Sequence, residues 1–150
     1  MEGYAMHEHI CMETDIRDHG TEPLAANLER IAKTNQNYRT ALWTGDKLQV
    51  TVMSIPVGGD IGLEMHPHTE QFIRIENGCA LAVMGPRKDS LNIHWKINSS
   101  YAVIVPAGTW HNIINIGNVP LKLYSVYAPV QHPFGTVHKT KKAAELEEKR

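Results

Sequence analysis

From Arg39 onward, short apolar runs rich in β-branched residues alternate with turn signals. The runs are RTALWT, LQVTVMSI, FIRIE, ALAVMG, LNIHWKI, YAVIVP, HNIINI and LKLYSVYA. Segments with Gly, Pro, Asn or Asp separate them, such as PVGGD, ENG and GNVP. Many short strands at a spacing of roughly 8–12 residues are typical of a β-sandwich or a β-barrel. The pattern therefore predicts an all-β domain.

The two ends of the chain depart from this pattern. Residues 1–22 are polar and lack a regular apolar period, so we expect a flexible or irregular segment there. Between Pro23 and Thr34 apolar residues recur at helical spacing, which predicts one short helix. The run KTKKAAELEEKR lies in segment 131–150, which we expect to be a charged tail or a fraying helix. The β-domain with its leading helix is then expected over residues 23–130.

One segment, GLEMHPHTEQFIRIENG, places metal-capable groups in an apolar strand pattern. Glu64 and His66 are two positions apart, so on a strand they point to the same face. A Pro-His-Thr turn follows, and the chain returns as a strand on which Gln71 shares its face with two isoleucines. That face is predicted to be the inner one. A hairpin of this kind would bring Glu64, His66 and Gln71 together.

A second segment, VIVPAGTWHNIIN, also places a metal-capable group in an apolar strand pattern. Its Pro-Ala-Gly turn ends one strand and redirects the chain. His111 opens the next strand, and Ile113 lies on the same face as His111. A histidine delivered from a remote strand to a Glu/His pair is a common way to build a metal site.

The second segment resembles the second motif of the cupin superfamily, G-x5-P-x-G-x2-H-x3-N. Pro106, Gly108, His111 and Asn115 fall at the expected spacings, and Ser100 stands where the leading glycine is usual. The first segment resembles the first cupin motif, G-x5-H-x-H-x3–4-E-x6-G, in the spacing of its positions but not in the residues that occupy them.

Counting back from Gly78 along the first motif places Gln71 where cupins usually have Glu. His66 then matches the second histidine, and Glu64 replaces the first. The run DIGLEMHPHTEQFIRIENG also resembles small single-domain bacterial cupins, some of them described as mannose-6-phosphate isomerase-like. The resemblance implies a jelly-roll β-barrel, also called a double-stranded β-helix.

The resemblance also implies one divalent cation in the barrel, bound by Glu64, His66, His111 and Gln71. A two-histidine, one-carboxylate set with open positions suits Fe(II). Mn(II) and Zn(II) are the alternatives, because both accept imidazole and carboxylate ligands. The amide of Gln71 either binds the metal directly or hydrogen-bonds a metal-bound water.

The other histidines are expected to be ordinary surface residues. His68 follows the Pro67 turn, His94 points outward from a strand, and the cluster at residues 7–9 is solvated. For His132 and His138, which follow the last strand, a position over the barrel mouth is the less usual alternative. Tyr127 shares a strand face with apolar residues and is a candidate for the pocket lining.

Composition excludes several classes of protein. The chain has 15 Lys and Arg against 16 Asp and Glu, a formal net charge of −1. Nucleic-acid binding, which needs a concentrated basic face, is not expected. No apolar run reaches the length of a membrane span, and the N-terminal residues do not resemble a secretory signal. Cys11 and Cys79 form no paired motif, so we expect two free thiols in a cytoplasmic protein.

Three functions are compatible with these residues. The first is a metal-dependent enzyme, a dioxygenase or a sugar isomerase, acting on a small sugar-like or hydroxy-carbonyl molecule. The second is a non-catalytic module that binds a small ligand, and the third is a barrel without metal. Arg39 and Arg74 are either solvated or positioned to bind an anionic substrate. No catalytic residue is identified by the sequence.

Apolar residues are expected on the outer strand faces as well as the inner ones. When His111 and Ile113 point inward, Ile114 and Ile116 point outward, and Phe72 lies opposite Gln71. Outward apolar side chains need a cover, either the N-terminal segment or a second chain. A homodimer is therefore expected.

Overall fold

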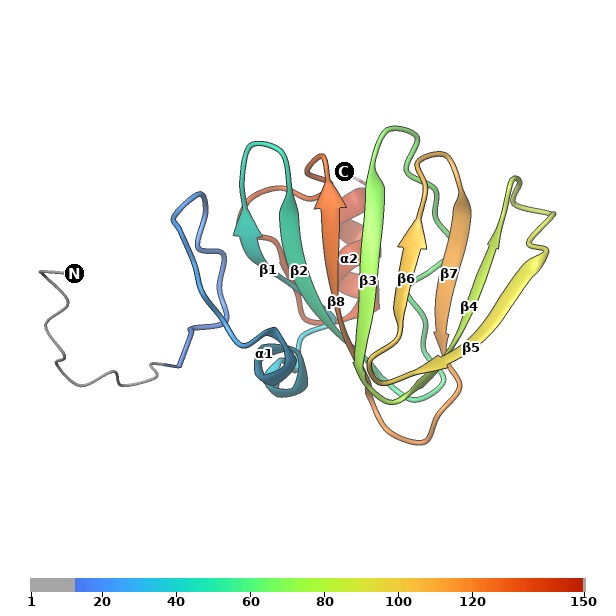
Figure 1. Cartoon of the computed structure of the whole chain (residues 1–150), viewed down its shortest axis with the longest axis horizontal. Coiled ribbons are helices and arrows are strands. Elements are labelled where there is room, and N and C mark those ends of the chain that lie inside the picture. The colour runs from blue at the N-terminus through green and yellow to red at the C-terminus, as the bar shows by residue number, and fades with distance from the viewer. Residues whose placement is uncertain (1–12, 150) are drawn as a thin grey trace, which may run out of the picture.

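A computed structural model describes residues 13–149 of the chain. In chain order its elements are α1 (Leu28–Thr34), β1 (Arg39–Thr44), β2 (Gln49–Ile55), β3 (Glu70–Asn77), β4 (Cys79–Gly85), β5 (Ile93–Asn98), β6 (Ala102–Val105), β7 (Trp110–Asn115), β8 (Leu121–Ala128), β9 (Val137–His138) and α2 (Lys141–Glu148). Figure 1 shows the strands side by side, with α1 at one end of the β1, β2 and β8 group. Each of the eight apolar runs predicted to be strands forms one of β1 to β8.

The strands form two antiparallel sheets. One sheet has the order β6-β3-β8-β2-β1-β9, and the other has the order β5-β4-β7. Neighbours such as β3 and β8 are distant in sequence, which is the crossing pattern of a jelly roll. The predicted all-β jelly-roll barrel is thus confirmed.

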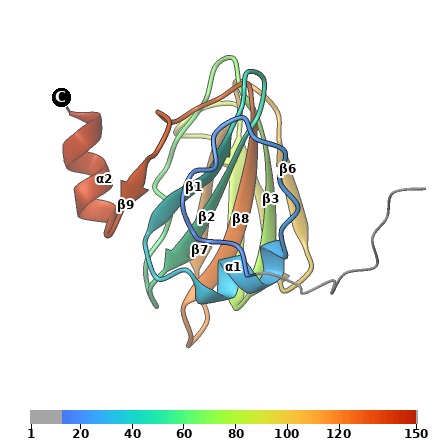
Figure 2. The ribbon, with the colours of Figure 1, turned by 90° about the vertical axis from the view of Figure 1, so that its left-hand side faces the viewer.

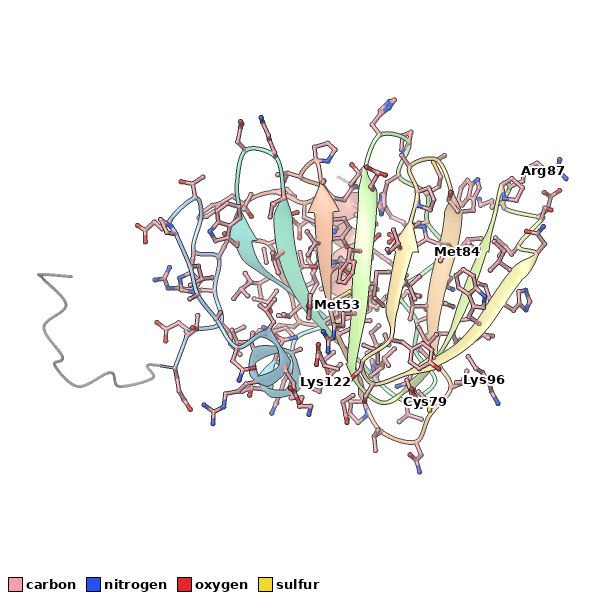
Figure 3. The ribbon with its side chains drawn as sticks, in the orientation of Figure 1. Met53, Cys79, Met84, Arg87, Lys96 and Lys122 are labelled. Atoms are coloured by element: carbon pink, nitrogen blue, oxygen red, sulfur yellow. The ribbon has the colours of Figure 1, made fainter. Side chains whose placement is uncertain are left out.

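The main apolar core lies between the two sheets. Met53 on β2 and Met84 on β4 come from different sheets, and both are buried (Figure 3). Ile73, Ile113 and Leu123 belong to the same cluster. Each sheet contributes alternate residues to this core, so the opposite residues of each strand face outward.

The segment before β3 is not the strand that the sequence predicted. Glu64 and His111 form an isolated β-bridge, and Asp60 and Ile114 form another. The segment therefore runs along β7 of the smaller sheet and does not form a hairpin with β3. Gly62 has a φ of 89°, a left-handed conformation that interrupts a strand.

Helix α1 is shorter than predicted. It begins at Leu28, because Asn27 caps it by accepting a 3.0 Å hydrogen bond from the backbone N–H of Arg30. The residues from Pro23 to Ala26 precede the helix. Ile31 and Ala32 pack against Leu42 and Val52, and this contact explains the helical spacing of the apolar residues.

The segment 131–150, expected as a charged tail or a fraying helix, contains a strand and a helix that pack on the barrel. β9 pairs with β1, with Arg39 opposite His138, and α2 follows (Figure 2). Thr140 caps α2, and Ala144 on the helix is only 3% exposed. The small buried alanine lets an otherwise charged helix lie against the barrel.

No helix among residues 13–149 has the length and apolar character needed to cross a membrane. Cys79 is a free, exposed thiol at the start of β4 (Figure 3). Cys11 lies outside the described residues, as does the predicted solvated cluster at residues 7–9.

Candidate metal centre

Glu64, His66 and His111 converge at one place inside the barrel. Each offers one ligand atom, and these atoms lie within 4.8 Å of one another. Oε1 of Glu64 is 3.3 Å from Nε2 of His66 and 3.4 Å from Nε2 of His111. His111 is fully buried, and the carboxylate of Glu64 is partly exposed. Such a set could hold a metal ion.

Backbone hydrogen bonds fix the three side chains. The N–H of Glu64 donates to the carbonyl of His111 at 3.0 Å, and the N–H of His111 donates to the carbonyl of Glu64 at 2.9 Å. The N–H of Gly108 donates to the carbonyl of His66 at 2.8 Å. Gly108 has a φ of 77°, so the Pro-Ala-Gly turn of the second segment positions His66 as well as His111.

Gln71 joins the cluster through its amide oxygen. Its Nε2 donates to Oγ of Ser125 at 3.2 Å, and its Oε1 lies 3.2 Å from Nε2 of His111. Gln71 is 3% exposed and comes from β3, as the strand pattern predicted. The oxygen thus faces the same point as the ligand atoms of Glu64 and the histidines.

The chemistry of these donors fits a cation. The Nδ1 of His111 lies 3.0 Å from the carbonyl of Thr109, a pure acceptor, so in the neutral ring Nδ1 carries the proton and Nε2 presents a lone pair. That lone pair faces the oxygens of Glu64 and Gln71, which are also acceptors. The Nε2 of His66 is buried and forms no hydrogen bond within the part of the chain that the structure describes. Several buried lone pairs directed at one point are stabilised by a shared metal ion.

The cluster favours the ionised form of Glu64. Burial alone would raise the pKa of this carboxyl, but in the metal-free protein the hydrogen bonds and charge of His111 and His66 rings that are protonated on Nε2 outweigh burial. The pKa of Glu64 is lowered to about 2. A carboxylate is thus available as a ligand over the whole physiological pH range.

Tyr127 and His132 lie beside the cluster. The ring centroid of Tyr127 is 6.0 Å from that of His66 and 5.2 Å from that of His132. Burial raises the pKa of Tyr127 to about 12, and burial followed by the charge of Arg39 lowers the pKa of His132 to about 3. Both side chains are therefore neutral near pH 7. His132 packs over the ring of Tyr127, the less usual of the two positions considered for it.

The remaining histidines separate into surface and buried residues. His68 is exposed in its turn, and His94 is exposed on β5, as predicted. His138 is 4% exposed, which corrects the expectation of an ordinary surface histidine. Its ring is held between Arg39, on the neighbouring strand, and Glu147 of α2. It is not part of the Glu64 cluster.

The two arginines considered as anion-binding residues, Arg39 and Arg74, differ in burial. Arg74 on β3 is partly exposed and pairs with Glu76 at 3.1 Å. Arg39 is only 3% exposed, so the expectation of a solvated side chain was wrong for it. Burial is continuous from Arg39 to Leu42 at the start of β1, so no alternation along the strand marked Arg39 as buried.

A jelly-roll barrel with a Glu/His/His cluster inside it defines a cupin-type protein. The Cupin domain family matches residues 51–127, and the chain belongs to this family. Cupins commonly bind a metal, and the cluster described above is where one could be held.

Similar proteins agree with this assignment. The chain is 56% identical over 126 residues to the uncharacterized protein YrkC of Bacillus subtilis, a match that spans 84% of this chain and 68% of YrkC. The crystal structure of BH2720 from Bacillus halodurans is 56% identical, with a TM-score of 0.87 over 87% of this chain and 99% of that one. A Klebsiella pneumoniae protein with a double-stranded β-helix domain, 21% identical, has a TM-score of 0.56 over 71% of this chain and 88% of its own. This last likeness shows the fold alone.

Proposed function

We propose that this protein is a metal-dependent enzyme that acts on a small oxygenated molecule. One divalent cation is bound by Glu64, His66 and His111, and the amide oxygen of Gln71 is the fourth ligand. The observation that carries the proposal is the orientation of His111: its protonated Nδ1 bonds Thr109, which leaves Nε2 facing acceptors only. A bound cation would accept the lone pairs of Nε2 and of the oxygens that face it.

Iron(II) is the favoured metal, with Mn(II) and Zn(II) as alternatives. Two imidazoles and one carboxylate on one side of an ion leave coordination positions open, as in non-haem iron oxygenases. When bound, the ion would supply positions for a chelating substrate and for dioxygen. The protein's own contribution is to hold the ligands in fixed orientations through the Glu64–His111 backbone pair and the Gly108–His66 hydrogen bond.

The side chains around the cluster favour a dioxygenase over a sugar isomerase. An isomerase that moves a proton between carbon atoms needs a base with a pKa near the working pH. The pKa of Tyr127 is raised to about 12, and that of His132 is lowered to about 3. Neither group exchanges protons readily at neutral pH. Chemistry that relies on metal-bound substrate and dioxygen has less need of such a base.

Dioxygen uptake by the Fe(II)-loaded protein tests the proposal. The protein is incubated with a panel of small hydroxy-carbonyl compounds, and the rate is compared with that of His111→Ala. His94→Ala is the matched control, because His94 is exposed on β5, an edge strand separated from β7 by β4, and does not belong to the Glu64 cluster. We expect substrate-dependent uptake by wild type and His94→Ala and none by His111→Ala. If an isomerised product forms without dioxygen uptake, the protein is an isomerase and not a dioxygenase. If the protein holds stoichiometric metal and binds a ligand without turnover, the non-catalytic binding module is favoured.

A further inference from the structure

A cavity of about 160 Å³ lies between α2 and the barrel. Tyr38 and Arg39 form one wall, the loop of residues 61–64 forms another, and one face of α2 closes it. Arg39 and the candidate metal ligand Glu64 are therefore both lining residues of the same space. A cavity of this size admits only a small molecule.

Arg39 enters this region from the inner face of the larger sheet. On β1 it is two residues from Ala41, which pairs with Thr51 on β2, and Thr51 pairs with Ser125 on β8. Ser125 accepts the hydrogen bond from Gln71. Because residues paired across neighbouring strands share a face, Arg39 lies on the same polar inner surface as the metal cluster.

The charge of Arg39 is buried without a carboxylate partner. The side chain is 3% exposed, and among residues 13–149 no ion pair joins it to Asp or Glu. One terminal nitrogen bonds Nδ1 of His138 at 3.2 Å, and the guanidinium lies 5.3 Å from the ring centroid of Tyr38. Its Nε is buried with no hydrogen-bond partner among the described residues. A buried cation left in this state is costly, and a bound anion would remove the cost.

The neighbouring groups do not supply that anion. His138 has its other nitrogen 2.6 Å from a carboxylate oxygen of Glu147, so His138 donates to Glu147 and accepts from Arg39. Lys141 pairs with Asp60. The acids of α2 that line the cavity, Glu145 and Glu148, belong to its helical wall, and the side chain of Glu145 is 57% exposed. The Nε of the Arg39 guanidinium thus has no anionic partner among the described residues.

We infer that Arg39 binds the carboxylate of a small acid whose other end is an oxygen ligand of the metal. The substrate class is then a short acid with an oxygen-bearing group at each end, closed in by α2. A guanidinium binds a carboxylate by two parallel hydrogen bonds, which fixes the acid's orientation toward Glu64, His66 and His111. The inference rests on the proposed function, because the second end of the acid is bound by the metal.

Calorimetric titration of the Mn(II)-loaded protein with matched acids tests this inference. The probes are malonate, succinate, glutarate and adipate, each compared with its monoamide. The monoamide keeps one carboxylate for the metal and loses the charge at the Arg39 end. At the chain length that spans the two sites, we expect the diacid to bind about 10- to 100-fold more tightly than its monoamide, as for hydrogen bonds between charged groups.

Variants of Arg39 test whether this residue causes the preference for the diacid. Arg39→Gln should bind diacid and monoamide equally, and Arg39→Lys should retain part of the preference because it keeps the charge without the fork. Arg74→Gln is the matched control, since Arg74 is partly exposed and paired with Glu76, and it should retain the full preference. A preference that persists in folded Arg39→Gln would overturn the inference. So would the absence of a preference at every chain length in wild type, a result that needs no variant to fold.

The metal content of the loaded protein separates this inference from the proposed function. Stoichiometric Mn(II) with no diacid preference overturns the Arg39 site and leaves the metal centre intact. If no metal binds, the proposed function fails, and the same pairs are titrated into metal-free protein. There the carboxylate of either acid is free to bind Arg39, so Arg39→Gln should weaken the binding of diacid and monoamide alike, and equal binding by wild type and folded Arg39→Gln would overturn the inference.

Discussion

Glu64 and His111 exchange both of their backbone hydrogen bonds, at 3.0 and 2.9 Å, although Glu64 belongs to no strand. The same bridge brings Oε1 of Glu64 to 3.4 Å from Nε2 of His111. Residues paired in this way project their side chains to the same side. A loop residue is thereby held as firmly as a strand residue, which is what a metal ligand requires.

Removing the charge of Glu64 should cost more metal affinity than removing Gln71. Glu64→Gln leaves two imidazoles and two amides, with no anion to offset the charge of the cation. We expect Glu64→Gln to weaken Mn(II) binding by more than about 100-fold, and Gln71→Ala to weaken it by only roughly tenfold, because a neutral amide oxygen is a weaker ligand than a carboxylate. Titration of each variant with Mn(II), Fe(II) and Zn(II) measures the difference. A greater loss in Gln71→Ala would contradict the ligand assignment and make His68 the residue to test.

Acid should destabilise the fold through His132. Its pKa is about 3 in the folded protein and near 6.5 when unfolded, because burial disfavours the charged ring. Between these values the unfolded chain binds a proton that the folded protein excludes, so the free energy of unfolding should fall as pH decreases from 6.5. The slope contributed by one such group is at most about 1.4 kcal/mol per pH unit.

Urea unfolding between pH 7 and pH 5, with a chelator present, measures this dependence. Glu64 does not contribute in this range, because its pKa is lowered from 4.5 to about 2. His132→Asn removes the titrating ring, so its stability should change less with pH than that of wild type. Identical slopes would show that the ring is not held neutral in the folded protein.

Two glycines should tolerate alanine very differently. A Cβ on Gly85 would lie 1.7 Å from the carbonyl oxygen of Ser90, so Gly85→Ala requires the backbone to move. Around Gly108 no atom lies within 4 Å of such a Cβ, and only its φ of 77° opposes the change. We expect losses of stability of about 3 kcal/mol for Gly85→Ala and about 1–2 kcal/mol for Gly108→Ala. Equal losses in urea unfolding would contradict the close approach at Gly85.

A homodimer remains a prediction, and the outer face of the larger sheet is where we expect it. Ile104 on β6 is 67% exposed and pairs with Phe72 on β3, whose ring lies 6.4 Å from that of Tyr124. Ile104→Glu should convert the dimer to a monomer in light scattering, and Val57→Glu, in an exposed loop, should not. A wild-type mass near the 16.8 kDa of one chain would contradict the dimer.

Local sequence patterns were sufficient for the strands and for two of the candidate ligands. The alternation in FIRIE placed Gln71 inside, and the turn before His111 placed that histidine at the start of an inward-facing strand. Glu64 was placed correctly by its motif position, although for the wrong structural reason. Its inward orientation comes from a bridge to β7, and no two-residue alternation on a continuous strand is involved.

The environment of Arg39 could not be predicted in the same way. Its burial depends on β9 pairing with β1 and on α2 folding back over the barrel, contacts between distant parts of the chain. The sequence of α2 is strongly charged, and the single buried Ala144 gives no periodic apolar signal. The start of the first helix was also predicted at the wrong residue. The side chain of Asn27, and not the apolar spacing, sets where α1 begins.

Elemental analysis after loading with Fe(II) and removal of free metal tests the central claim most directly. Wild type and His68→Ala, in which an exposed histidine is removed, should each retain about one divalent ion per chain. The double variant His66→Ala/His111→Ala should retain none, because both buried imidazoles of the cluster are lost. Stoichiometric metal in a folded double variant would contradict the account and place the site elsewhere in the chain.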